Sequence, residues 1–142
     1  CNIAEPQTGL EVKFSMRHAA AMTLADVDTG SLHSYSDDIA SRADLVELRD
    51  KVTIIDKSFN SRMQSEVIVH LKDKRSLHQF SDAGVPASDL DKQEAKLIRK
   101  FNSLVAPVYG DDVSESVLEK CLRLDSLENV AELFDDIVGK NR

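Results

Sequence analysis

The stretch that decides the fold is residues 66–80, EVIVHLKDKRSLHQF. Apolar positions at Val67, Val69 and Leu71 alternate with their neighbours, and the alternation resumes at Leu77 after a charged run. A period of two that is interrupted by a short polar turn is typical of a β-hairpin with one buried face. The turn has Asp-Lys where Asp-Gly is the preferred pair. We therefore predict an antiparallel hairpin in the middle of the chain.

The segments on either side of the hairpin predict helices. Apolar residues recur at helical spacing, and Ser15 is placed to cap the first helix through its hydroxyl. The expected helices cover residues 14–27, roughly 38–50, 90–108, a shorter stretch from 114, and 127–138. We expect Gly30 to take a left-handed conformation after the first of these helices.

A third strand is expected at Val52–Ile55, where all four residues are β-branched. Strands grouped between runs of helix are typical of the α+β class. The sequence thus predicts a small antiparallel three-stranded sheet packed by about five helices. We expect residues 1–12 to be a linker and residues 13–142 to form the domain.

Composition excludes several classes of protein. The chain has 142 residues, enough for one domain, with 42% hydrophobic and 30% charged residues. Its net charge of −7 argues against nucleic acid as a partner, because binding to a duplex requires clustered cations. No apolar run has the length of a membrane span, so we expect no membrane partner. No leader or transit segment is recognisable, and the cytoplasm is the expected location.

The two cysteines do not form a disulfide framework or a Cys-x-x-Cys pair. We expect Cys121 to be a buried thiol on the apolar side of its helix. Cys1 leaves two alternatives open. The chain is a fragment of a longer protein, which we prefer, or a mature lipoprotein that begins with a lipidated cysteine.

Most candidate chemical groups have a simple structural explanation. His70 and His78 could face each other across the hairpin, but no third ligand is placed near both, so we expect exposed histidines and no metal. The chain has no Gly-rich phosphate loop, and we expect no nucleotide cofactor. Three acidic pairs close to helix ends favour capping over catalysis: Asp37-Asp38, Asp111-Asp112 and Asp135-Asp136.

One polar cluster is a better functional candidate. Residues 13–18, KFSMRH, place two cations and one imidazole at the first turn of the first expected helix. Free backbone amides at a helix N-terminus already favour an anion. Lys13, Arg17 and His18 are therefore candidates for docking a carboxylate.

This cluster and its sequel resemble the C-terminal domain of the MmgE/PrpD family, the family of 2-methylcitrate dehydratase, cis-aconitate decarboxylase and iminodisuccinate epimerase. The resemblance extends from about residue 10 to 138. Residues 11–21 resemble the family's AKFSLPYAVA opening, with Met-Arg-His in place of Leu-Pro-Tyr. Residues 67–75 resemble its V-x-V-x-L-x-DGR hairpin, with Asp-Lys-Arg in place of Asp-Gly-Arg. Weaker similarities lie at residues 45–52, at Gly84-Val85-Pro86 and at Lys100-Phe101.

The resemblance implies a lyase or isomerase that acts on a citrate-like polycarboxylic acid. The expected reaction is acid–base chemistry next to a carboxylate (dehydration, decarboxylation or epimerisation) without metal or cofactor. It implies His18 as a catalytic residue and Lys13 and Arg17 as substrate-binding residues. It also implies a helical domain before this one and a homodimeric parent enzyme, so we expect the 142 residues alone to be inactive. The alternative is a non-catalytic binding module.

Overall fold

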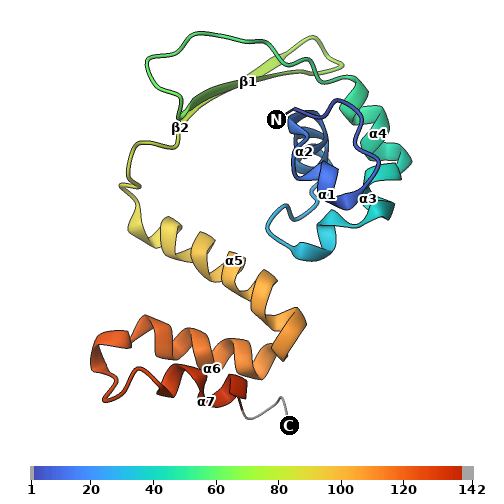
Figure 1. Cartoon of the computed structure of the whole chain (residues 1–142). Helices are drawn as coiled ribbons and strands as arrows, with labels where there is room; N and C mark the ends of the chain where they lie inside the picture. The colour runs from blue at the N-terminus through green and yellow to red at the C-terminus, as the bar shows by residue number, and fades with distance from the viewer. Residues whose placement is uncertain (1, 139–142) are drawn as a thin grey trace. The chain divides into compact units, whose positions relative to one another are not determined.

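The computed structural model describes residues 2–138, which form two compact units (Figure 1). Of the described residues, the first unit contains 2–54 and 94–138, and the second contains 55–93. The described residues form seven α-helices and one two-stranded antiparallel sheet. The predicted α+β class is confirmed, but the sheet has two strands, not three.

Helix α2 (Met16–Leu24) begins where the sequence predicts. The Ser15 hydroxyl accepts a hydrogen bond from the backbone N–H of His18 at 3.2 Å, which satisfies one donor of the first turn. The helix ends earlier than expected. Asp26, not Gly30, takes the left-handed conformation (φ 56°), and the Val27 N–H donates to the Met22 carbonyl at 2.9 Å. This six-to-one bond closes the helix, so no left-handed glycine is needed four residues later.

The expected linker over residues 1–12 is partly folded into the first unit. Helix α1 (Gly9–Val12) is capped by the Thr8 hydroxyl, which accepts from the Glu11 N–H at 3.3 Å. Val12 is buried, and the Gly9 N–H donates to the Asp37 carboxylate at 2.8 Å. Helix α1 could not be predicted from the sequence, because one turn of helix is too short to show a periodic apolar pattern.

Gly9 provides a test of this packing. A Cβ added at Gly9 would lie 1.9 Å from the backbone oxygen of Tyr35, whereas one added at Gly30 would mainly meet the Asp28 side chain, at 3.1 Å. We expect Gly9→Ala to lower the free energy of unfolding by about 1–3 kcal/mol, because backbone atoms cannot move aside as a side chain can. Urea unfolding measures this. A Gly9→Ala variant no less stable than Gly30→Ala would contradict the packing.

The N-terminal part of the first unit is completed by short helices. These are the 3-10 helix η1 (Leu32–Tyr35) and helices α3 (Asp37–Ser41) and α4 (Ala43–Asp50). The single helix expected over 38–50 is divided at Arg42, whose backbone is extended (ψ 117°). The core of this part consists of Val12, Ala21, Met22, Ala40 and Leu45.

The second unit contains the predicted hairpin. Strands β1 (Gln64–His70) and β2 (Ser76–Asp82) pair antiparallel, with Val69 opposite Leu77. Lys74 takes the left-handed position in the turn (φ 69°), where glycine is preferred. The predicted third strand at Val52–Ile55 is wrong. β-branched residues stabilise a strand only when a neighbour completes the hydrogen-bond ladder, and this segment has no such neighbour among residues 2–138.

The prediction of a buried hairpin face is also wrong. Val67 and Leu77 lie on the same face of the hairpin, yet they are 56% and 55% exposed. The opposite face carries Glu66, whose side chain is only 22% exposed. Alternation in the sequence therefore identified the two faces correctly but not their burial, which depends on what packs against them.

Three further helices follow the hairpin: α5 (Leu90–Tyr109), α6 (Asp111–Leu122) and α7 (Glu132–Val138), with a 3-10 turn η2 (Leu124–Ser126) before the last. Helices α6 and α7 contact each other, and the Lys120 ammonium donates to the Asp136 carboxylate at 2.7 Å. Cys121 is exposed, which corrects the expectation of a buried thiol. The buried residues of that helix are Val113, Ser114 and Val117, the last of them one turn before Cys121. None of the described helices has the length and apolar character needed to cross a membrane.

Candidate functional site

The three candidate residues lie at the junction of α1 and α2. Lys13 caps the C-terminal end of α1, and its exposed ammonium lies 5.1 Å from the centre of the Tyr35 ring. This distance is within the range of a cation–π contact. The contact holds the Lys13 side chain near the surface of the unit without neutralising its charge.

Arg17 lies in the first turn of α2 and is half-buried. Its Nε atom is buried and has no hydrogen-bond partner among the described residues. A buried guanidinium N–H without an acceptor is costly, because the group has lost its water and gained nothing in return. Arg17 therefore has an unused donor next to His18 in the sequence.

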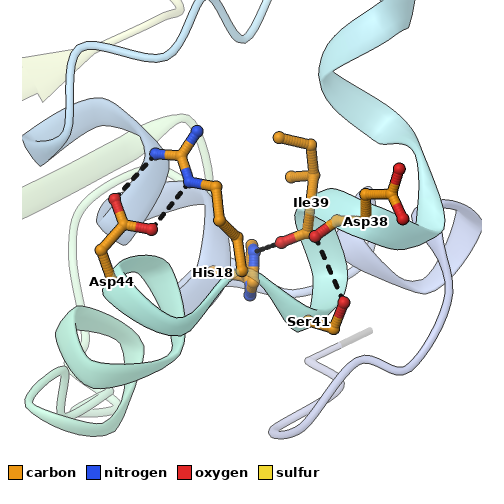
Figure 2. Close-up of polar contacts among 6 residues, drawn as sticks. His18, Asp38, Ile39, Ser41 and Asp44 are labelled. Carbon is orange, nitrogen blue, oxygen red and sulfur yellow. Dashed lines mark hydrogen bonds and ion pairs between the residues drawn. The ribbon is translucent and has the colours of Figure 1, made fainter.

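His18 is fully buried and joins α2 to α3. Its Nε2 atom lies 3.1 Å from the backbone oxygen of Ile39 (Figure 2). A carbonyl oxygen can only accept, so in the neutral ring Nε2 carries the proton and Nδ1 carries the lone pair. Nδ1 is also buried and has no hydrogen-bond partner among the described residues. The geometry thus yields a fixed tautomer with an unused acceptor.

The surroundings keep this ring neutral. The pKa of His18 is lowered from its ordinary value of 6.5, first by burial, which disfavours the charged form. The hydrogen bond to Ile39 acts in the opposite direction, and the positive charges of Arg49 and Arg42 lower the pKa further. Near neutral pH, His18 is a neutral base with a free lone pair.

The two arginines near His18 have carboxylate partners of their own. Arg42 donates to both oxygens of Asp44, at 2.8 and 3.0 Å. Arg49 is paired with Asp50. Sequence analysis did not single out either arginine, because only the packing of α4 against α2 brings this part of the chain close to His18.

A family model described as the MmgE/PrpD C-terminal domain matches residues 1–124. The chain belongs to this family. The resemblance seen in the sequence is thereby confirmed for most of the chain. A comparison with curated proteins and a comparison with solved structures each found no match.

Within this MmgE/PrpD domain the candidate residues do not form one connected network. Among residues 2–138, no hydrogen bond or ion pair joins Lys13, Arg17 and His18 to one another. They share one short segment of backbone, but their side chains have separate surroundings. Lys13 contacts the Tyr35 ring, Arg17 has a buried Nε without a partner, and His18 is bonded to the Ile39 carbonyl. The imidazole and the Arg17 guanidinium share one property, which is a buried nitrogen without a partner.

The hairpin of the MmgE/PrpD domain carries a second polar cluster that sequence analysis missed. His78 lies opposite Ile68 and His70 opposite Ser76, so the two histidines do not face each other. Instead, Nε2 of His78 lies 2.5 Å from Glu66, whose other carboxylate oxygen accepts from Lys57. The Lys57 hydrogen bond is the main reason why the pKa of Glu66 is lowered. Glu66 and His78 are diagonal neighbours across the hairpin, a relation that the predicted register could have revealed.

Both histidines of the hairpin have protein partners, since Nδ1 of His70 lies 2.8 Å from the Ser76 hydroxyl and His78 is paired with Glu66. The described part of the chain contains no group of three or more His, Cys, Asp or Glu residues placed to hold a metal ion. The hairpin cluster is an ion-pair network on one face of a small sheet.

The lowered pKa of His18 predicts how stability changes with pH. The unfolded chain, with its ordinary histidine pKa of 6.5, binds a proton more readily than the folded chain. Stability is therefore fully present above that pKa and falls as the pH drops from about 7.5 to about 5.5. Urea unfolding midpoints measured at both pH values should show a smaller drop in His18→Gln than in the wild type. Equal drops would contradict the lowered pKa.

Proposed function

We propose that this chain is the C-terminal domain of an enzyme that removes or adds a proton next to a carboxylate of a small polycarboxylic acid. The observation that carries this proposal is the buried His18 ring, held as one neutral tautomer with an unpartnered Nδ1 atom. Such an atom can take a proton at neutral pH, because the ring is not already charged. Membership of the MmgE/PrpD family supports the same reaction class.

The three candidate residues would have two different roles, proton transfer and stabilisation of negative charge. In the proposed step, the C–H bond next to the substrate carboxylate breaks, the proton moves to Nδ1 of His18, and the electron pair stays on the substrate. Negative charge then builds beside an existing carboxylate. Lys13 and Arg17, whose cations lie on the same segment, would stabilise that charge. In decarboxylation the C–C bond to the carboxylate breaks and CO₂ leaves, and the electron pair left on the substrate takes a proton from Nδ1 of His18, which must first have taken that proton from solvent.

The burial of His18 places a condition on this proposal. Nδ1 is enclosed among the described residues, so a substrate can reach it only if the side chains around the first turn of α2 move. Proton transfer also requires the substrate within about 3 Å of the acceptor. The enclosed form is therefore the state without substrate.

One feature supports a partner surface on the first unit. Leu10, Phe14 and Met16 are large apolar side chains, each about half or more exposed, in the short segment of the chain that carries the candidate site. Large exposed apolar side chains gathered in one segment are typical of interaction sites. We propose that a helical domain of the same protein packs there, that the parent enzyme is a homodimer, and that it works in the cytoplasm without metal or organic cofactor.

A substrate screen on the protein expressed from its complete reading frame tests the function. Citrate-like and aspartate-derived acids are incubated with the enzyme in deuterium oxide, and the products are followed by proton NMR. Exchange of the hydrogen next to a carboxylate, loss of water or loss of CO₂ identifies the reaction. Absence of all three for every acid would overturn the proposal and favour the alternative of a non-catalytic binding module. Cys1, on which the lipoprotein form of that alternative depends, lies outside the described residues.

A further inference from the structure

A small pocket lies between the N-terminal segment and helices α3 and α4. It has a volume of about 230 Å³ and is lined by Pro6, Gln7, Ala40, Ser41, Val46 and Arg49. None of the three residues proposed for catalysis lines it. Its volume is below the range of about 300–1,000 Å³ that is common for ligand pockets, so its occupant would be small.

The pocket contains one buried charge. Arg49 is only 7% exposed; its Nε donates to one carboxylate oxygen of Asp50 at 2.8 Å, and its Nη2 lies 2.7 Å from the same oxygen. A guanidinium usually meets a carboxylate with two donors on two oxygens. Here both nitrogens lie against one oxygen, and the Nη1 edge of Arg49 has no hydrogen bond or ion pair among the described residues.

The charge of Arg49 is poorly neutralised. The Asp50 side chain is 60% exposed, so water competes for it, whereas the Arg49 side chain is almost fully withdrawn from water. A buried charge is expensive unless it is well paired. The positive charge of Arg49 also repels the protonated form of His18 and so lowers the pKa of His18.

The other polar groups near the pocket do not supply the missing negative charge. The Ser41 hydroxyl donates to backbone oxygens of α3, at 3.3 Å, and keeps its lone pairs. Among the described residues, no carboxylate lines the pocket. Glu11 and Asp37 are engaged with backbone amides, since they accept from Gln7 at 2.6 Å and from Gly9 at 2.8 Å.

We propose that this pocket binds a small carboxylate, which pairs with the open Nη1 edge of the Arg49 guanidinium. A planar carboxylate matches the guanidinium fork, and the pocket has room for only a few atoms beyond that group. The apolar side chains of Pro6, Ala40 and Val46 would contact the short hydrocarbon part of the ligand. The site is separate from the proposed catalytic residues, so it does not depend on the proposed function.

Ligand-observed NMR with acetate as the probe tests this site. Saturation transferred from the complete protein to the acetate methyl group is measured as a function of acetate concentration at constant ionic strength. We expect saturable binding by the wild type. Val46→Phe, which fills the pocket and leaves Arg49 in place, and Arg49→Met, which removes the charge, should each weaken binding by about tenfold or more.

A matched control adds the same bulk outside the pocket. Val67 is 56% exposed on the hairpin of the second unit and does not line the pocket, so Val67→Phe should bind acetate as the wild type does. Circular dichroism reports whether each variant is folded, and the comparison of Val46→Phe with Val67→Phe carries the test if Arg49→Met does not fold. Saturable binding that is equal in Val46→Phe and Val67→Phe, or no saturable binding by the wild type, would overturn the proposal. Both results are independent of catalytic activity.

Discussion

The His18→Ala variant of the complete protein is expected to lose about 10²-fold or more in kcat/KM, the effect typical of removing a positioned acid–base group. The reason lies in the state of the ring. His18 is neutral, it donates from Nε2 to Ile39, and it keeps an unused acceptor at Nδ1. No other titratable side chain in the first turn of α2 can accept a proton near neutral pH. Steady-state kinetics with the substrate identified by the screen measure the loss.

A buried histidine also supports the fold, so a second variant separates the two roles. Glutamine at position 18 has an amide N–H that can donate to the Ile39 carbonyl, but it cannot take up a proton at neutral pH. We expect His18→Gln to unfold close to the wild-type urea midpoint at about pH 7.5 and to be as inactive as His18→Ala. Near-wild-type activity in a folded His18→Gln variant would show that His18 only ties α2 to α3.

The second large effect concerns stability. Leu45→Ala is expected to lower the free energy of unfolding of the N-terminal helices by about 2–5 kcal/mol, through lost burial and the cavity left behind. Leu45 is completely buried, and it belongs to the same core as Met22 and Val12. Hydrogen exchange in the peptides that cover α2 and α4, followed by mass spectrometry, measures this local free energy in the complete protein.

Leu32 provides a matched control for this measurement. It is 57% exposed in the 3-10 helix η1, so Leu32→Ala removes the same atoms without opening a buried cavity. We expect its exchange in the same peptides to remain close to that of the wild type. Equal acceleration in both variants would mean that Leu45 is not part of a packed core.

Local features of the fold could be predicted from the sequence because neighbouring residues decide them. The Ser15 cap needs only its own hydroxyl and an amide three residues away. The hairpin follows from alternation along two short strands. The family resemblance is of the same kind, since it depends on short motifs in order along the chain.

Features that depend on distant partners could not be predicted in this way. Val52–Ile55 has the composition of a strand, but a strand also needs a neighbouring strand to pair with. The expected helix over 38–50 has a continuous period, but the chain turns at Arg42 and thereby places Ile39 against His18. The burial of the hairpin face also could not be predicted, because alternation shows which residues share a face but not whether another element covers it.

For the candidate site, the sequence by itself determined the residues: a histidine, an arginine and a lysine at the start of one helix in a domain of the MmgE/PrpD family. Only the tertiary structure decided their states. Burial against Ile39 fixed the tautomer of His18 and lowered its pKa, and the approach of α4 added the charge of Arg49. The physical reason is that the sequence states only which residue stands at each position. Folding brings distant residues near, and these residues set the hydration, the hydrogen-bond partner and the electrostatic field of each side chain.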